Sequence, residues 1–238
     1  MRIINCQSAA VLLCLLINSS IAAQENDCQD QTPSTPHRND TAATKQIAGL
    51  FDQANADTDF KIGMAHYEGR CVSQDFGEAL SWFRKAADKG YAPAQYAVGV
   101  MYETGEGVQQ DYENAIAWYG RAAKQGLASA RFKLGLMYWK GLGTGQDIPK
   151  AVAFLRMAAE QGEAAAQKLL GLIYANGQGI PQDYILAYLL FDAAAGVGTE
   201  DYVAAKNRGM VARKMSQQQL TDAKVLSDKW KPGTPLPR

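Results

Sequence analysis

Apolar and polar positions follow a pattern that recurs every 36 residues along the chain. Aligning residues 60–95, 96–131, 132–167 and 168–203 requires no gap. In each unit, apolar residues at helical spacing predict a first helix, a Gly-x-Gly segment predicts a loop, and a second apolar helical stretch follows. A fixed period of this length is typical of proteins built from stacked helix-loop-helix units. The pattern therefore predicts an all-α fold.

Certain residues recur at the same position of every unit, and we call each such set a column. Each column has a physical explanation in a helix-loop-helix unit. One aspartate per unit is expected to cap the start of the second helix, and in the first unit Glu78 would form a capping-box-like pair with it. These aspartates are Asp75, Asp111, Asp147 and Asp183. We expect the large core side chain of the second helix to come from the column Trp82, Trp118, Phe154 and Leu190. A left-handed glycine is expected to end that helix at Gly90, Gly126, Gly162 and Gly198.

These columns resemble a known repeat. The third unit reads Leu134-Gly135-x-x-Tyr138-x-x-Gly141-x-Gly143-x-x-x-Asp147, followed by Lys150-Ala151-x-x-Phe154-x-x-x-Ala158-Ala159-x-x-Gly162. This pattern is similar to the Sel1-like repeat, a relative of the tetratricopeptide repeat with a longer inter-helix loop. The resemblance implies a right-handed α-solenoid of four 36-residue repeats. The first unit departs from the pattern, with His66 at the motif tyrosine and Cys71 at the second loop glycine.

The segments that flank the repeats are expected to cap them. Residues 44–59 place apolar side chains on one helical face and predict an N-terminal capping helix. Residues 204–238 predict C-terminal helices and a proline-rich tail, and the pair Ser216 and Gln219 predicts a capping box for the last helix. Residues 24–43 are polar and contain two prolines, which predicts a flexible leader.

The first 23 residues have the pattern of a secretory signal peptide. Arg2 gives a positive start, Ala9 to Ile17 is apolar, and Ala22-Ala23 ends the segment with small residues. The alternative is an uncleaved membrane anchor, but a spanning helix needs about 18 apolar residues or more. We therefore expect an exported chain with no integral membrane segment after cleavage. The periplasm is the expected compartment, with secretion as the alternative.

Cleavage would leave two cysteines, Cys28 and Cys71. An even pair in an exported chain favours one intramolecular disulfide. Two free thiols, or an intermolecular bridge through Cys28, are the alternatives.

Charge and composition exclude several function classes. The 238 residues contain 24 basic and 24 acidic side chains, with no block of lysine or arginine. Nucleic-acid binders carry a concentrated positive patch, so we expect no nucleic-acid partner. Four cysteines and two histidines leave little material for a metal site, and we expect no metal and no cofactor.

Catalytic motifs are absent from the sequence. No serine has a lysine at the third position after it, as the S-x-x-K motif of serine β-lactamases requires. His66 lies in a column otherwise filled by tyrosine and is interpreted as a core substitution rather than a catalytic base. We therefore expect no catalytic residue. The resemblance offers the alternative of penicillin-binding or β-lactamase activity, reported for some secreted relatives, but the cysteine pair within each unit of those relatives is absent here.

We therefore expect the function to depend on exposed residues that contact a partner. Stacked helix pairs form an extended concave face that commonly binds partners. Columns of the first helices that vary between units supply the contact candidates Tyr67, Lys133, Trp139 and Lys140, because aromatic and long cationic residues dominate interface energetics. Trp139 could instead fill a gap between neighbouring units.

The sequence thus predicts a monomeric, non-catalytic adaptor or scaffold in the cell envelope that binds a protein or peptide on its concave face. The alternative is a structural or regulatory component of an envelope machine.

Overall fold

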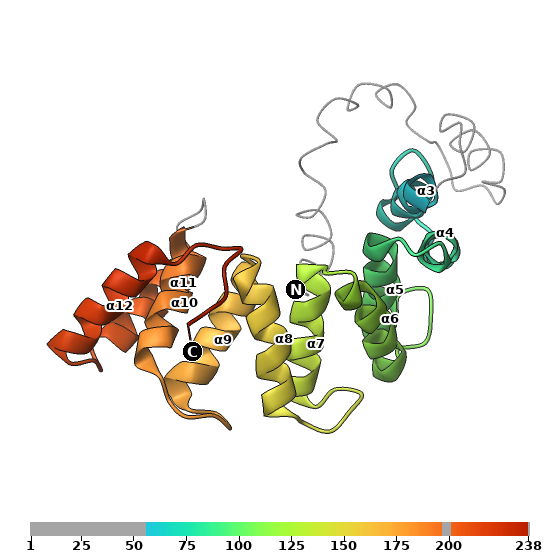
Figure 1. Ribbon diagram of the computed structural model, residues 1–238. Coiled ribbons are helices and arrows are strands. Elements are labelled where there is room, and N and C mark those ends of the chain that lie inside the picture. Colours follow the sequence, from blue (N-terminus) through green and yellow to red (C-terminus); the bar gives the residue numbers. More distant parts are fainter. Residues whose placement is uncertain (1–55, 197–200, 238) are drawn as a thin grey trace, which may run out of the picture. The chain divides into compact units, whose positions relative to one another are not determined.

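The computed structural model describes residues 56–196 and 201–237 (Figure 1), and in these residues all regular structure is helical. The first helices of the repeats are α3 (Ala56–Glu68), α5 (Ala92–Thr104), α7 (Ala128–Lys140) and α9 (Ala164–Asn176). The second helices are α4 (Phe76–Asp88), α6 (Tyr112–Lys124), α8 (Ile148–Glu160) and α10 (Tyr184–Gly196). Equivalent helices begin 36 residues apart, as the pattern predicted, and the repeated helix pairs form an α-solenoid.

The first repeat helix begins earlier than the sequence pattern suggested. Residues 56–59 were expected to end an N-terminal capping helix, but they form the first turn of α3. The reason is that Asp59 and Phe60 are both buried within one continuous helix, at the same distance from the loop as their equivalents in the later repeats. The rest of the expected capping helix lies outside the described residues, as do the expected signal peptide and leader.

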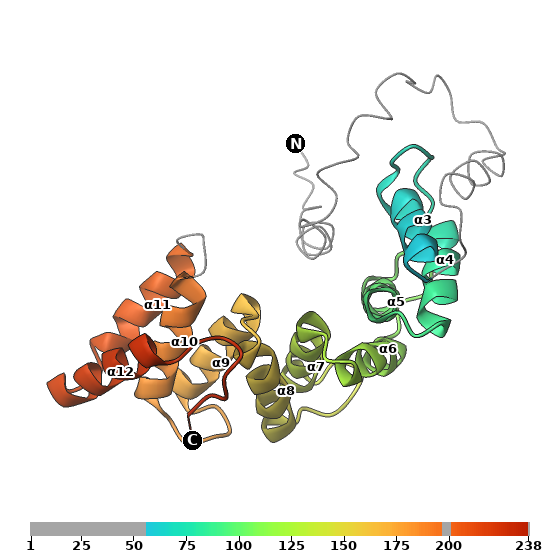
Figure 2. The same cartoon turned by 45° about the horizontal axis from the view of Figure 1, so that its top comes forward.

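The described residues form two compact units that divide between Trp118 and Tyr119, inside α6. In the first unit, α4 packs against both α3 and α5. In the second unit, successive helices from α7 to α11 pack in order, and α12 also contacts α10. Figure 2 shows the paired helices of each unit from a second direction.

The buried side chain of each second helix lies one position later than predicted. Phe83, Tyr119, Leu155 and Phe191 are fully buried. Trp82, Trp118 and Phe154 are only partly buried, so the predicted column was wrong by one residue, although Leu190 is also buried. Position 83 lies four residues after Ala79 and four before Ala87, and therefore falls on the buried stripe of small residues.

Glycine in the first helix makes room for this large side chain. A Cβ atom built on Gly63 would lie 2.6 Å from the Phe83 ring, and one on Gly135 would lie 2.7 Å from Leu155. The same contact in the last repeat would be 2.9 Å, between Gly171 and Phe191. The two helices of a repeat are therefore held together by a large residue that packs directly on the backbone of its partner helix.

Each inter-helix loop is fixed by two side chains. The aspartate column caps the second helix as predicted, with Asp75 accepting from the backbone N–H groups of Gly77 at 2.8 Å and Glu78 at 3.0 Å. The residue before each aspartate is a glutamine whose side-chain amide donates to a carbonyl at the end of the first helix. The donors are Gln74, Gln110, Gln146 and Gln182, and the acceptors are Tyr67, Glu103, Trp139 and Ala175.

The second loop glycine packs against the preceding repeat. A Cβ on Gly107 would lie 2.4 Å from the backbone oxygen of Phe76, and one on Gly179 would lie 2.9 Å from Ile148. Both glycines have a positive φ, near 70°. Cys71 occupies the equivalent position of the first repeat with φ 62°. Within the described residues no repeat stands before the first one, so the stacking contact that requires glycine at Gly107 is not made at Cys71.

Two further helices follow the repeats, α11 (Tyr202–Ala212) and α12 (Gln217–Lys229). Ser216 and Gln219 form a reciprocal capping box at the start of α12. After α12, Trp230 and Leu236 are buried in the same apolar cluster as Leu155. None of the helices in the described ranges is long and apolar enough to cross a membrane.

Gly107→Ala is expected to destabilise the first unit by about 2–4 kcal/mol, because the new methyl group overlaps a backbone oxygen in addition to straining a positive φ. Gly90→Ala is the matched control, since Gly90 also has a positive φ but no atom within 4 Å of the added Cβ. It should cost only about 1 kcal/mol. Urea unfolding of both variants measures the difference, and equal losses would contradict the close packing at Gly107.

Stability at acid pH is expected to depend on Asp59, a buried carboxylate that contacts Lys85 at 2.8 Å and Lys89 at 2.5 Å. Burial alone would raise the pKa of Asp59, but hydrogen bonds and charge from the two lysines hold it below 3.8. The stabilisation is therefore complete above the unfolded pKa and is lost as the pH falls through the folded pKa.

Asp59→Asn should remove this pH dependence between about pH 5 and pH 3, and should cost about 1.5 kcal/mol at neutral pH. The exposed Asp88 provides the control, and Asp88→Asn should leave the unfolding free energy within about 0.5 kcal/mol of wild type. Thermal melts at stepped pH check both. An unchanged acid limb in Asp59→Asn would be the contrary result.

Candidate functional site

Three of the four predicted contact residues lie on α7. Lys133 and Trp139 are partly buried, and Lys140 is exposed at the end of the helix. The fourth, Tyr67, lies on α3 in the other unit. The predicted pairing of Cys28 with Cys71 involves a residue outside the described ranges.

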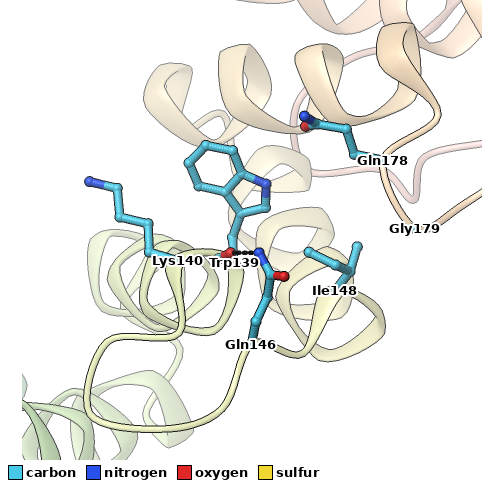
Figure 3. Close-up of a pocket in the computed structure, with 6 residues that line it drawn as sticks. All are labelled: Trp139, Lys140, Gln146, Ile148, Gln178 and Gly179. Carbon is cyan, nitrogen blue, oxygen red and sulfur yellow. Dashed lines mark hydrogen bonds between the residues drawn. The ribbon is translucent and has the colours of Figure 1, made fainter.

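Trp139 and Lys140 line an open pocket of about 550 Å³ between the loops of the third and fourth repeats (Figure 3). Gln146 and Ile148 from the third repeat complete one side. From the fourth repeat come Gln178 and Gly179. Figure 3 shows the Trp139 indole standing between Lys140, which extends away from the other residues, and the two glutamines with Ile148. Lys133 is on the same helix but does not line this pocket.

The pocket is open because the pair of aromatic rings that closes the equivalent position in the first unit has changed. The equivalent residues of the first two repeats, 72 positions earlier, are Tyr67, Phe76, Glu106 and Gly107. There the Tyr67 and Phe76 rings meet edge to face at 5.3 Å, and the Tyr67 hydroxyl donates to the Glu106 carboxylate at 2.8 Å. Ile148 replaces Phe76 and lacks a ring to cover the aromatic side chain. The space that Phe76 fills in the first unit is therefore open beside Trp139.

Tyr67 itself is a correction to the sequence prediction. Its side chain is 5% exposed, because Phe76, Phe83 and Glu106 surround it. Burial and the neighbouring Glu106 carboxylate raise the pKa of Tyr67 well above its usual value. The hydroxyl therefore remains a hydrogen-bond donor inside the fold, and Tyr67 offers almost no surface to a partner.

The arrangement around Trp139 suits an apolar or aromatic side chain presented by a peptide. The indole also packs against the apolar cluster of the second unit, which holds it in place. Gln146 is oriented by the hydrogen bond from its side-chain amide to the Trp139 carbonyl at 2.7 Å. Amides and a lysine ammonium next to an aromatic face provide partners for peptide backbone groups. Trp139 thus packs between repeats and also lines a pocket, and its contact with a partner stays a prediction.

Within residues 56–196 and 201–237, the structure also places the potential metal ligands and His66. No group of three or more histidine, cysteine, aspartate or glutamate side chains there could hold a metal ion. His66 is 1% exposed and lies in the core, where a substrate would not reach it.

Four residues of the pocket were missed by the sequence reasoning: Gln146, Ile148, Gln178 and Gly179. The sequence signal that could have found them is a repeat position at which an aromatic residue is replaced by an aliphatic one. The position of Ile148 is aromatic in the other three repeats, as Phe76, Tyr112 and Tyr184. A lost ring next to a gained tryptophan predicts a local hollow.

Similarity to known proteins agrees with the repeat geometry. The model of the Sel1 repeat matches residues 56–91, 92–127, 128–163 and 164–196. These matches begin where α3, α5, α7 and α9 begin, four residues earlier than the alignment made from the sequence pattern. Among curated proteins, no significant match is found.

Solved structures of similar chains come from several bacteria. A Sel1 repeat protein from Oxalobacter formigenes is 34% identical over 80% of both chains, with a TM-score of 0.65. The protective antigen c5321 of uropathogenic Escherichia coli is 29% identical over 81% of this chain and 49% of its own, with a TM-score of 0.47. A Sel1 repeat protein from Klebsiella pneumoniae is 21% identical over 78% of this chain and 92% of its own, with a TM-score of 0.49.

The four matched repeats, the 36-residue spacing of the helices and the similarity to the Oxalobacter protein agree with one another. The chain belongs to the Sel1 repeat family.

Proposed function

We propose that this Sel1 repeat protein is an exported, non-catalytic adaptor that binds a protein or peptide partner in the cell envelope. Sel1 repeats typically mediate contacts between proteins, and stacked helix pairs present extended surfaces for that purpose. The pattern of the first 23 residues supports export, with the periplasm as the proposed compartment and secretion as the alternative. A monomer that uses its concave face remains part of the proposal.

The pocket beside Trp139 is the observation that carries the binding proposal. It combines an aromatic anchor held by core packing, amide groups from two repeats, and a cationic rim at Lys140. Binding energy at protein interfaces concentrates on such partly buried aromatic residues. Lys133 would add a second cation on the same helix without lining the pocket itself.

A disulfide between Cys28 and Cys71 is also proposed. In its support, Cys71 is exposed and disulfide-bonded, and the other cysteines of the chain all precede residue 56. Such a bond would attach the segment before the repeats to the loop of the first repeat.

Trp139→Ala is expected to weaken partner capture by about 10-fold or more, because the change removes the aromatic anchor of the pocket. The measurement is a pull-down from envelope extract with the purified mature chain, followed by titration with the partner that it captures. Trp82→Ala is the matched control: Trp82 is a partly buried tryptophan of the other unit, and its loss should leave capture unchanged. Equal capture by wild type and Trp139→Ala would refute the pocket as the binding site. Turnover of nitrocefin by the same preparation would refute the non-catalytic assignment.

The disulfide predicts a difference between reduced and non-reduced protein. Non-reduced peptide mapping by mass spectrometry should recover one cross-linked pair that contains Cys28 and Cys71, and reduction should add about 2 Da to the intact mature chain. Cys28→Ser should leave a free thiol at Cys71 that reacts with an alkylating reagent. Quantitative alkylation of both cysteines in the wild-type protein, without prior reduction, would exclude the bond.

A further inference from the structure

The segment after α12 returns to α8 through a turn, in which the Thr234 N–H donates to the Lys231 carbonyl oxygen at 3.1 Å, and then continues beside α8 without regular structure. We call residues 231–237 the tail, and Figure 1 shows it in dark red as it leaves α12 and returns toward α8 and α9. One side chain anchors it: Leu236 is 4% exposed and packs in the apolar cluster that contains Leu155 and Ile173. Most other residues of the tail are exposed.

The polar contacts between the tail and α8 use only the backbone of the tail. The Gly233 N–H donates to the Glu160 carbonyl oxygen at 2.6 Å, and the Leu236 N–H donates to Glu160 Oε1 at 2.9 Å. Arg156 Nη2 donates to the carbonyl oxygens of Leu236 and Pro237, both at 2.9 Å. None of these four hydrogen bonds requires a particular tail side chain. A peptide that forms the same turn, with glycine at the Gly233 position (φ 94°) and an apolar residue at the anchor position, could make them.

Part of the receiving site is held in place by contacts outside the tail. Arg156 Nη1 donates to the Tyr174 hydroxyl at 2.8 Å, which orients the guanidinium toward the tail carbonyls. Glu160 is the last residue of α8, so its carbonyl oxygen has no partner within the helix and is available to a peptide N–H. Arg156 and Glu160 are four residues apart and therefore share one helix face. A site that is ordered in advance binds at a lower entropic cost.

The arginine-tyrosine pair belongs to the repeat rather than to the tail. Arg84 donates to the Tyr102 hydroxyl at 2.5 Å, and these residues stand 72 positions before Arg156 and Tyr174. Arg84 is exposed, whereas Arg156 is partly buried beneath the tail. The tail thus lies on a surface that the repeat also builds elsewhere.

We propose that Arg156, Glu160 and the apolar hollow that holds Leu236 form a binding site for a proline-rich peptide in which a glycine turn is followed by a leucine-proline step. The tail is the internal occupant of this site, and a partner peptide of the same kind displaces it. Three of the seven tail residues are prolines, which restrict the backbone and reduce the ordering cost of binding. This site is separate from the pocket beside Trp139 and goes beyond the proposed adaptor function, because it names a ligand class and an internal competitor.

The test uses the full mature chain and a fluorescent synthetic peptide, Lys-Pro-Gly-Thr-Pro-Leu-Pro-Arg, which copies residues 231–238. Leu236→Asp should release the internal tail while leaving the site intact. Because the tail then no longer competes, this variant should bind the peptide at least about 10-fold more tightly than wild type by fluorescence anisotropy. A peptide with aspartate in place of leucine should not bind. Equal affinity of wild type and Leu236→Asp would overturn the proposal.

Arg156→Ala, made in the Leu236→Asp chain, should abolish peptide binding. Arg84→Ala in the same chain is the matched control, since it removes the equivalent arginine without touching the site, and it should bind as the parent does. An equal loss in both would show that no specific site exists. Lys140→Ala, which changes the rim of the Trp139 pocket but not the apolar cluster around Leu236, should bind this peptide normally, so failure here is distinguishable from failure of the Trp139 pocket.

A second measurement needs no variant and applies if Leu236→Asp does not fold. Saturating peptide should accelerate hydrogen exchange at the Gly233 and Leu236 amides of the wild-type chain, because displacement breaks the hydrogen bonds that both donate to Glu160. Unchanged exchange at both amides in saturating peptide would overturn the proposal.

Discussion

The contact between a glycine of one helix and a large side chain of its partner sets the geometry of every repeat in which it is described. At Gly63 and Phe83, and again at Gly135 and Leu155, the helices approach so closely that a single methyl group would overlap the packed side chain. Protein interiors tolerate little change in volume, so this contact fixes the distance between the two helices. The loops then need only to return the chain, which the aspartate caps and glutamine hydrogen bonds accomplish within eight residues or fewer. The large residue is Phe83, Leu155 or Phe191 in these repeats. The backbone of the facing glycine therefore accepts more than one apolar side chain.

Variation is permitted where repeats meet, and that is where both candidate binding sites arise. The pair Tyr67 and Phe76 closes one such junction with ring contact and a hydrogen bond to Glu106. The equivalent pair Trp139 and Ile148 leaves a pocket. On α8 the tail covers Arg156, whereas Arg84 in the equivalent arginine-tyrosine pair is exposed. At the junction between repeats, the closed and open versions differ in at least two side chains. At α8 the arginine and the tyrosine are unchanged, and the difference is the tail that covers them.

Much of the fold could be predicted from the sequence because repetition amplifies weak signals. A single aspartate before a helical stretch means little, but four at intervals of 36 residues predicted the caps at Asp75, Asp111, Asp147 and Asp183. The buried column was misplaced by one residue, since Trp82 and Phe83 are both large and apolar and only the position of Gly63 decides between them. Tyr67 was misjudged for a related reason: a column that varies between repeats indicates freedom from a common contact, not exposure to solvent. The tail contacts could not be predicted, because they join Arg156 to residues about 80 positions away through backbone atoms that leave no sequence pattern.

Cys71 has a consequence for how such an array can change in length. The glycine at this repeat position allows a preceding helix pair to approach the loop, as Phe76 approaches Gly107. With a cysteine side chain there, a repeat duplicated in front of the first one would meet a Cβ atom where the backbone must pass. Units could be gained or lost between the later repeats by simple copying of 36 residues, whereas growth at the amino-terminal end would first require Cys71 to become glycine. A cysteine at this position is therefore incompatible with a repeat that stacks in front of it in the way that the first repeat stacks on Gly107.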